Sequence, residues 1–263
     1  MAVLSEEQSM LRDAAKSWVQ EKSPVKAFRT MRDSGSALGL ILEETGRTLT
    51  ASPLLASALG AASALILGGT EEQKQAWLTK IADGSAVATL AIDEGAHHAP
   101  ERTALAATKS GAGYSLSGNK SFVLEGMAAD VFVVAARTSG KAGETAGITL
   151  FLVPADAKGV SRKRLALADS RGAAQVSFDK VEVGADAILG EADNGWSLLE
   201  KTLDRARAGI CAEMLGSAVQ AFETTLDYLK TRVQFGQVIG SFQALQHRAA
   251  KMFTDLELGP ALD

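Results

Sequence analysis

The spacing of apolar residues changes twice along this chain, and the two changes limit the folds open to it. Up to about residue 84 and again after Asp193, apolar residues recur every three or four positions, which is typical of amphipathic helices. Between these parts, short runs of branched and aromatic residues alternate with glycines, as in strands joined by turns. The order of helices, strands and helices predicts an α+β fold with segregated layers, and it argues against an alternating parallel sheet.

The same changes predict three domains. Residues 1–84 are expected to form an N-terminal helical domain, residues 85–190 a central antiparallel β-sandwich or barrel, and residues 191–263 a long helical hairpin from an incomplete bundle. In the first domain, apolar residues between Met10 and Val19 predict one helix, and breaks follow at Ser23-Pro24 and from Asp33 to Ser36. Further helices are expected at 40–47, at 53–68 and from Thr70, a capping residue, to Gly84.

The most regular helical pattern lies in the last domain. Apolar residues from Leu199 to Leu229 step by three or four and predict one continuous buried helix face. The phase breaks at Phe235 and Gly236, after which Ser241 is placed to cap a second helix. Cys211, in the first helix, is expected to be a small buried residue. Two long helices joined by a turn follow from this pattern.

The turn of this hairpin, Arg232 to Gln237, combines a guanidinium, two amides, an aromatic ring and a glycine. Arginine offers forked donors to oxyanions, and glycine allows a ligand to approach the backbone closely. The cluster suits a phosphate or a flat polar ring. It also suits an ordinary turn with an arginine ion pair, and the residues alone leave both interpretations open.

Bulk properties exclude several classes of protein. The net charge of -4 shows no basic excess, which argues against nucleic acid as the main partner. One cysteine permits no internal disulfide and indicates a reducing, cytoplasmic setting. No signal peptide is indicated, and the apolar stretch from Leu54 to Leu67 is too short and too interrupted to span a membrane. No nucleotide-binding glycine motif is present, and His97, His98 and His247 do not have the spacing of a zinc site.

Four motifs resemble those of the acyl-CoA dehydrogenase family, and they occur in that family's order over most of the chain. The first resembles the end of the family's helical domain, the second its β domain, the third the start of its last domain, and the fourth its flavin-binding stretch. In this sequence they are Gly69–Lys74 with Trp77-Leu78, Gly118–Val123 with Ala129-Asp130, Leu203–Arg207, and Arg232–His247.

The resemblance implies an FAD enzyme that oxidises an acyl-CoA thioester to the 2,3-enoyl-CoA and passes electrons to an electron-transfer flavoprotein. It implies that four hairpin residues contact the FAD of a neighbouring subunit, so a homo- or hetero-oligomer, dimer or tetramer, completes the site. These residues are Arg232, Gln234, Phe235 and Gln243. It places Asp204 and Arg207 near the acyl-CoA, although a surface ion pair between helix neighbours explains that pair equally well.

Departures from the family pattern concern the flavin loops. Leu124, after Phe122 and Val123, replaces the threonine that meets the flavin in the family, so that side-chain hydrogen bond is lost. The loop that begins at Ile92 and ends at His98 lacks both hydroxyl groups of the family's loop. Backbone groups of these segments remain available to a flavin ring.

The catalytic residue is not identified. Some family members carry the base at the position of Ala206, and most carry it in a segment beyond the position of Asp263. Asp204 is rotated by about 200° around the helix from Ala206 and is a poor substitute, while Glu213 lies two turns on. Family segments are also missing between Gly39 and Leu40, either lost or outside this sequence. The alternative function is therefore a non-catalytic subunit that completes the FAD site of a partner dehydrogenase.

Overall fold

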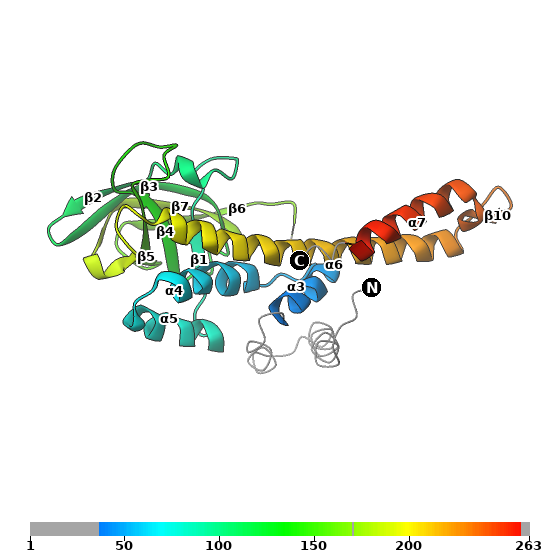
Figure 1. Ribbon diagram of the computed structural model, residues 1–263, viewed down its shortest axis with the longest axis horizontal. Helices are drawn as coiled ribbons and strands as arrows, with labels where there is room; N and C mark the ends of the chain where they lie inside the picture. The colour runs from blue at the N-terminus through cyan, green and yellow to red at the C-terminus, as the bar shows by residue number, and fades with distance from the viewer. Residues whose placement is uncertain (1–36, 170, 259–263) are drawn as a thin grey trace. The chain divides into compact units, whose positions relative to one another are not determined.

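The computed structural model describes residues 37–169 and 171–258 (Figure 1). They belong to two compact units, one of residues 51–207 and the other of residues 37–50 together with 208–258. The long helix α6 (Trp196–Thr231) takes part in both. The helix expected between Met10 and Val19, and the breaks expected at Ser23-Pro24 and near Asp33, lie outside the described residues. The three-part division of the chain stays a prediction.

Helices open the larger unit. A π-helical turn, η1 (Leu55–Ala61), continues into α4 (Ala62–Gly68), and α5 (Glu71–Asp83) follows. The hydroxyl of Thr70 accepts a hydrogen bond from the amide of Gln73, and the side-chain oxygen of Gln73 accepts one from the amide of Thr70. The predicted capping box is therefore present. Gly84 ends α5 in the left-handed conformation, with φ of 77°. The predicted helix from Thr70 to Gly84 is confirmed.

One eight-stranded sheet forms the centre of this unit, in the order β6-β7-β3-β2-β4-β5-β8, with β1 paired to β4. All pairs are antiparallel except β1 with β4 and a single bridge between β2 and β4, so the expected, mostly antiparallel β domain is confirmed. Short 3-10 turns, η2 (Pro100–Arg102) and η3 (Ala185–Ala187), connect strands. The strands are β1 (Ala88–Ala91), β2 (Ala106–Ser110), β3 (Gly113–Leu124), β4 (Val131–Arg137), β5 (Ile148–Pro154), β6 (Val160–Leu165), β7 (Ala173–Val183) and β8 (Ile188–Leu189).

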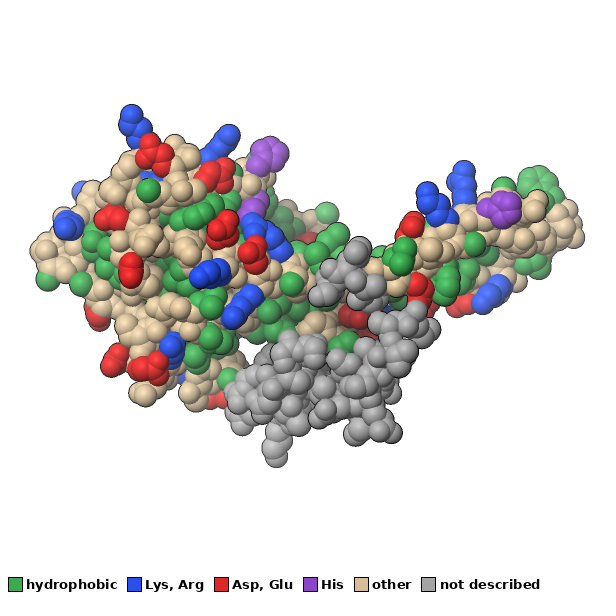
Figure 2. Space-filling view, viewed as in Figure 1, with side chains coloured by type: hydrophobic (Ala, Val, Ile, Leu, Met, Phe, Trp, Pro, Cys, Tyr) green, Lys and Arg blue, Asp and Glu red, His purple; other side chains and the backbone are tan. Residues whose placement is uncertain are grey.

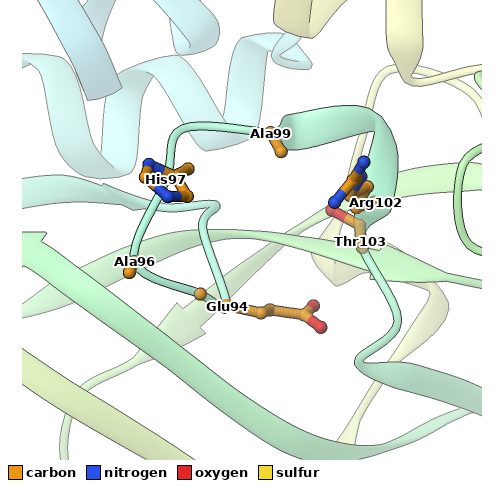
Figure 3. A pocket seen from close by; sticks show the side chains of 7 residues that line it. Glu94, Ala96, His97, Ala99, Arg102 and Thr103 are labelled. Carbon is orange, nitrogen blue, oxygen red and sulfur yellow. The ribbon is translucent and has the colours of Figure 1, made fainter.

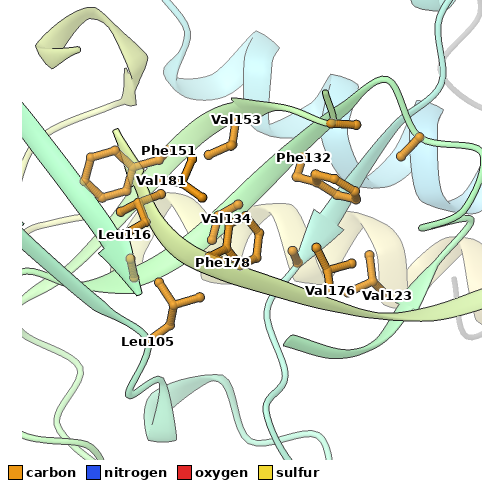
Figure 4. Packing of buried hydrophobic residues seen from close by; sticks show 14 of the residues in the cluster. Leu105, Leu116, Val123, Phe132, Val134, Phe151, Val153, Val176, Phe178 and Val181 are labelled. Carbon is orange, nitrogen blue, oxygen red and sulfur yellow. The ribbon is translucent and has the colours of Figure 1, made fainter. Parts of the chain in front are cut away.

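Strand β4 is buried on both faces, which explains its uninterrupted apolar sequence. Alternate residues enter two different cores. Val131 and Val133 pack with helices η1 and α4 and with the start of α6, while Phe132 and Val134 enter a core enclosed by the strands. Figure 4 shows that second core, in which side chains from β3, β4, β5 and β7 meet. The sheet is therefore held by one core between strands and another beneath its helices.

In the smaller unit, α3 (Ala37–Arg47) packs very closely against α6. A Cβ atom added to Gly46 would lie 2.0 Å from the carbonyl oxygen of Glu213, and one added to Gly216 would lie 1.8 Å from that of Glu43. Ser217 donates a hydrogen bond of 2.9 Å to the carbonyl of Gly46 across the same contact. Glycine at both positions permits the two backbones to touch.

The predicted hairpin of long helices is present. After α6 comes a two-residue ladder of β9 (Val233–Gln234) and β10 (Gln237–Val238), then η4 (Ile239–Ser241) and α7 (Gln243–Leu258). Phe235 and Gly236 both have positive φ, 55° and 77°, as a tight type I′ turn requires. The expected cap at Ser241 is wrong, because Ser241 lies in η4 and its hydroxyl donates to the carbonyl of Val238.

The expected continuous burial of the first hairpin helix is also wrong. Leu199 and Leu203 are buried, but Ile210 is 42% and Met214 65% exposed. The helical period predicted an apolar face correctly, and the buried part of that face, Leu199 and Leu203, packs beneath the sheet. Cys211, expected to be buried, is an exposed free thiol. Figure 2 shows hydrophobic side chains at the surface of this hairpin, between charged ones.

Candidate functional site

Two segments that lie about 30 residues apart in the sequence meet at one end of the sheet. The amide of Ser121 donates a 2.7 Å hydrogen bond to the carbonyl of Asp93, and the hydroxyl of Thr89 donates one of 2.7 Å to the carbonyl of Leu124. These bonds place Ile92, which follows β1, beside the end of β3. The sequence-predicted residues Ile92 and 122–124 are therefore neighbours.

Their side chains differ in what they offer to a ligand. Ile92 is 7% and Val123 2% exposed, and each packs in a hydrophobic core, so neither side chain is available to a ligand. Leu124 is half-buried. Phe122 is 49% exposed and lies in a bulge of β3, with φ of 52°. A bulge with a non-glycine residue at positive φ re-aims a side chain at the cost of backbone strain, and here it brings an aromatic ring to the surface.

The loop after Ile92 is tied down by two adjacent carboxylates. Asp93 accepts from the amide of Ala99 at 3.0 Å and pairs with Nδ1 of His98 at 2.8 Å. Glu94 accepts from the amides of Ala104 and Leu105, at 3.0 and 2.9 Å. Together these bonds close a compact loop from Asp93 to Leu105.

Lys120 joins this loop to β3. Its side chain is fully buried, and its Nζ donates to the carbonyl of Ile92 and to Oε1 of Glu94, both at 2.7 Å. Burial lowers the pKa of Lys120 to about 8, although the charges of Glu94 and Asp93 act in the opposite direction. Arg137 adds to the lowering by like-charge repulsion.

A cavity of about 210 Å³ lies within the loop. Figure 3 shows His97 and Arg102 on different sides of this cavity, with the carboxylate of Glu94 between the loop and the sheet. Nearby, the buried guanidinium of Arg137 donates to four carbonyls and so holds the loop's second half to its neighbours. The acceptors are the carbonyls of Glu101, Thr103, Glu144 and Ala146.

The hairpin gathers the second predicted group. Four exposed residues form this group, and they come from the connection after α6 and from the first residue of α7. They are Arg232, Gln234, Phe235, which is 92% exposed, and Gln243. The rings of Phe235 and Phe242 meet edge to face, with centroids 6.2 Å apart. The amide of Ile239 donates to the carbonyl of Arg232 and closes the turn. The guanidinium, two amides and a ring are thus presented together at one end of the hairpin.

The third predicted group lies on α6. Nη1 of Arg207 and Oδ1 of Asp204 are 2.7 Å apart, and both side chains are more than half exposed. Ala206, which lies between these two residues in the sequence, is half-buried. Its methyl side chain cannot take up a proton. The arrangement holds an ion pair and contains no base at the position where some family members carry one.

The pairing of Lys120 with Glu94 is only partly predictable from the sequence. Period-two alternation places Lys120 on the same face of β3 as the buried Leu116, and this alternation was the available signal. Its partner could not be inferred, because Glu94 comes from a loop whose path no sequence pattern gives. The pairing of His98 with Asp93 depends on the path of the same loop.

Comparison with known proteins decides the family. Three models match successive parts of the chain, the N-terminal, middle and C-terminal domains of acyl-CoA dehydrogenases, at residues 31–85, 77–181 and 193–262. Isovaleryl-CoA dehydrogenase, mitochondrial, of Pongo abelii is 32% identical over 295 residues, covering 96% of this chain and 69% of that protein. This chain belongs to the acyl-CoA dehydrogenase family.

Other acyl-CoA dehydrogenases agree in sequence and fold. The short/branched chain specific acyl-CoA dehydrogenase of Bos taurus, mitochondrial, is 36% identical over 193 residues, which are 72% of this chain and 44% of that protein. The solved acyl-CoA dehydrogenase from Geobacillus kaustophilus is 26% identical, with a TM-score of 0.87 over 99% of this chain and 78% of that one. The chain thus spans less than half the length of the bovine relative.

The described residues carry neither the pattern of a metal site nor that of a membrane-spanning helix. Within the described ranges, no three His, Cys, Asp or Glu side chains gather as they would around a metal ion. Among the helices of the same residues, none is long and apolar enough to cross a membrane.

Proposed function

We propose that this chain is an FAD-dependent acyl-CoA dehydrogenase subunit that takes part in α,β-desaturation of an acyl-CoA thioester, with electrons passed to an electron-transfer flavoprotein. Membership of the acyl-CoA dehydrogenase family supports the reaction class. The observation that carries the assignment is the meeting of Ile92 with the end of β3, which forms one site from two segments expected to face a flavin.

The residues present fit this cofactor. Phe122 offers an exposed aromatic ring, and the bonds from Ser121 to Asp93 and from Lys120 to Ile92 hold the loop after Ile92 next to it. When bound, FAD supplies a hydride acceptor for the β carbon of the acyl group. In this proposal Phe122 packs against the isoalloxazine ring, and the closed loop after Ile92 limits water at its edge.

We assign the hairpin to the FAD of a neighbouring subunit. Arg232 is exposed and suits a pyrophosphate, because forked, charge-assisted hydrogen bonds are the stronger kind. Gln234 and Gln243 supply amides, and Phe235, 92% exposed, supplies a ring. Exposed apolar side chains along the hairpin support an oligomer, since patches of this kind mark interaction surfaces. They include Ile210, Met214, Tyr228, Val233, Met252 and Phe253.

Asp204 and Arg207 remain our candidates for contact with acyl-CoA. Their ion pair lies on the exposed face of α6, where the guanidinium retains donors for a phosphate or a carbonyl of the substrate. The proposal includes a cytoplasmic location, which rests on the single cysteine.

A second candidate function is that of a non-catalytic subunit which completes the FAD site of a partner dehydrogenase. Ala206 favours it, because alanine stands where some family members carry the base and the nearby Asp204 is engaged with Arg207. In that case Arg232 and its neighbours serve a partner of the same family, and the proton is removed by a residue of that partner.

The test is anaerobic reduction of flavin by acyl-CoA. The full chain is purified, incubated with FAD and mixed with straight-chain and branched acyl-CoA thioesters while the visible flavin absorbance is followed. Bleaching by the chain alone supports the first function and excludes the second. Bleaching that occurs only when the chain is co-expressed with another dehydrogenase subunit supports the second. Flavin that stays oxidised in both preparations contradicts both.

A further inference from the structure

The only charged side chain with no exposed surface among the described residues belongs to Lys120. A buried ammonium group is costly unless it is paired and hydrogen-bonded. Here it has one carboxylate partner, Glu94, and one carbonyl partner, Ile92, each at 2.7 Å. Burial of this amine therefore costs free energy of solvation, which the two hydrogen bonds offset. What these two bonds connect indicates the role of Lys120.

Both acceptors of the Lys120 amine belong to the loop segment: Glu94 lies in the loop, and Ile92 directly precedes it. Glu94 also accepts from Ala104 and Leu105, so the bond from Lys120 reaches the far end of the loop through one carboxylate. The bond to Ile92 reaches its near end. One amine thus fixes the beginning and the end of the loop to the same strand.

The loop is connected through Lys120 to the end of β3, which the proposed function places beside the flavin. Lys120 is the last residue in regular register with β7 before the shift that contains Phe122, and pairing resumes at Val123. Ser121, next to Lys120, donates to Asp93 and adds a backbone bond between the same two segments. The separation between Phe122 and the loop is therefore set by the side chain of Lys120 together with the backbone of Ser121.

We propose that Lys120 is a positioning residue for the flavin, which holds the loop from Asp93 to Leu105 at a fixed separation from Phe122. The inference rests on the proposed function. Lys120 does not touch the cofactor in this account; it acts through the two segments that do.

Hydrogen exchange in the flavin-free protein tests the loop connection by itself. In Lys120→Met, segment 93–105 is expected to exchange at least tenfold faster than in the wild type, while β4 keeps its protection. Glu94→Gln is expected to have a smaller effect, because its amide oxygen still accepts from Ala104 and Leu105. Unchanged exchange of the loop in Lys120→Met overturns the proposal.

Titration with FAD tests the consequence for the cofactor. We expect the Kd of Lys120→Met for FAD to rise at least tenfold, with an altered visible spectrum of the bound flavin. Val181→Ala removes two methyl groups from a fully buried side chain in the same sheet, so it destabilises the fold but leaves both hydrogen bonds of Lys120 in place. Its Kd is expected to equal that of the wild type.

The outcomes separate the two proposals. A wild-type Kd in Lys120→Met, or a rise in Kd that Val181→Ala shares, overturns the positioning role and leaves the proposed function standing. A wild-type chain that binds no FAD, alone or co-expressed, contradicts the proposed function, and the flavin part of this inference falls with it. The exchange experiment still decides whether Lys120 holds the loop.

Discussion

Lys120 couples the stability of the fold to pH at the residue scale. Burial lowers its pKa from the ordinary 10.5 to about 8, against the opposing charges of Glu94 and Asp93 and with the repulsion of Arg137. Between these two values the unfolded chain binds the proton more often than the folded chain does. The contribution of this group to the free energy of unfolding therefore rises with pH from 8 to 10.5.

Urea denaturation at several pH values checks this direction. The wild type is expected to gain stability relative to Lys120→Met as the pH rises from 7.5 to 10. Other groups that titrate in this range act in both proteins, so they cancel in the comparison. Parallel stability curves for the two proteins would show that the amine of Lys120 titrates as it does in water.

Ala206 gives a second prediction at this scale. A carboxylate at position 206 would stand where some family members carry the base, and a positioned general base contributes about 10²- to 10⁴-fold to a rate. We expect Ala206→Glu to bleach the flavin with acyl-CoA at least tenfold faster than the wild-type chain. Ala208→Glu, on another side of the same helix, is the matched control, and equal rates in the two variants would exclude a base at 206.

At the scale of elements, the contact between α3 and α6 depends on glycine. Gly46→Ala places a Cβ 2.0 Å from the Glu213 carbonyl oxygen, so the helices must separate, and overpacking of this kind costs about 1–3 kcal/mol. Gly39→Ala in the same helix meets nothing within 4 Å and is expected to be neutral or stabilising by up to about 1 kcal/mol. Denaturation of both variants measures the difference. Equal stabilities would mean that the helices do not touch at Gly46.

Helices and strands are predictable from the sequence where a local pattern determines them. They are not predictable where contacts with neighbouring elements determine them. The capping box at Thr70 and the two-sided strand β4 carried strong local patterns. Strand β6, with Ser-Arg-Lys-Arg at its centre, was not predicted, because an edge strand shows charged residues in place of alternation. Strand β3 continues from Gly113 to Leu124 although its pattern breaks near Phe122, because a bulge absorbs the break.

In the candidate site, too, residues marked by a sequence pattern are predictable and contacts that depend on the path of a loop are not. Sequence resemblance indicated Ile92 and residues 122–124, and the structure brings them together. It gave no sign that Lys120 and Glu94 connect them, since that bond depends on the path of a loop. The roles of Arg232 and the other hairpin residues, and those of Asp204 and Arg207, stay predictions.

At the scale of the whole molecule, the hairpin predicts association. Ile210 and Met214 lie on one face of α6 and are 42% and 65% exposed, so a second chain that covers them would remove apolar surface from water. We expect the double variant Ile210→Glu, Met214→Glu to sediment as a smaller species than the wild type. Lys201→Glu, an exposed position at the start of the helix, should leave the sedimentation coefficient unchanged. Equal coefficients for all three proteins would place any interface elsewhere.

The most direct test of the proposed function is the ratio of flavin to polypeptide after gel filtration of the full chain with FAD. The proposed function predicts that yellow flavin co-elutes with an oligomer at about one FAD for each site-forming chain. It also predicts that Arg232→Ala, a change at an exposed side chain, lowers this ratio. A colourless protein peak, for the chain alone and for the chain co-expressed with another dehydrogenase subunit, would contradict it.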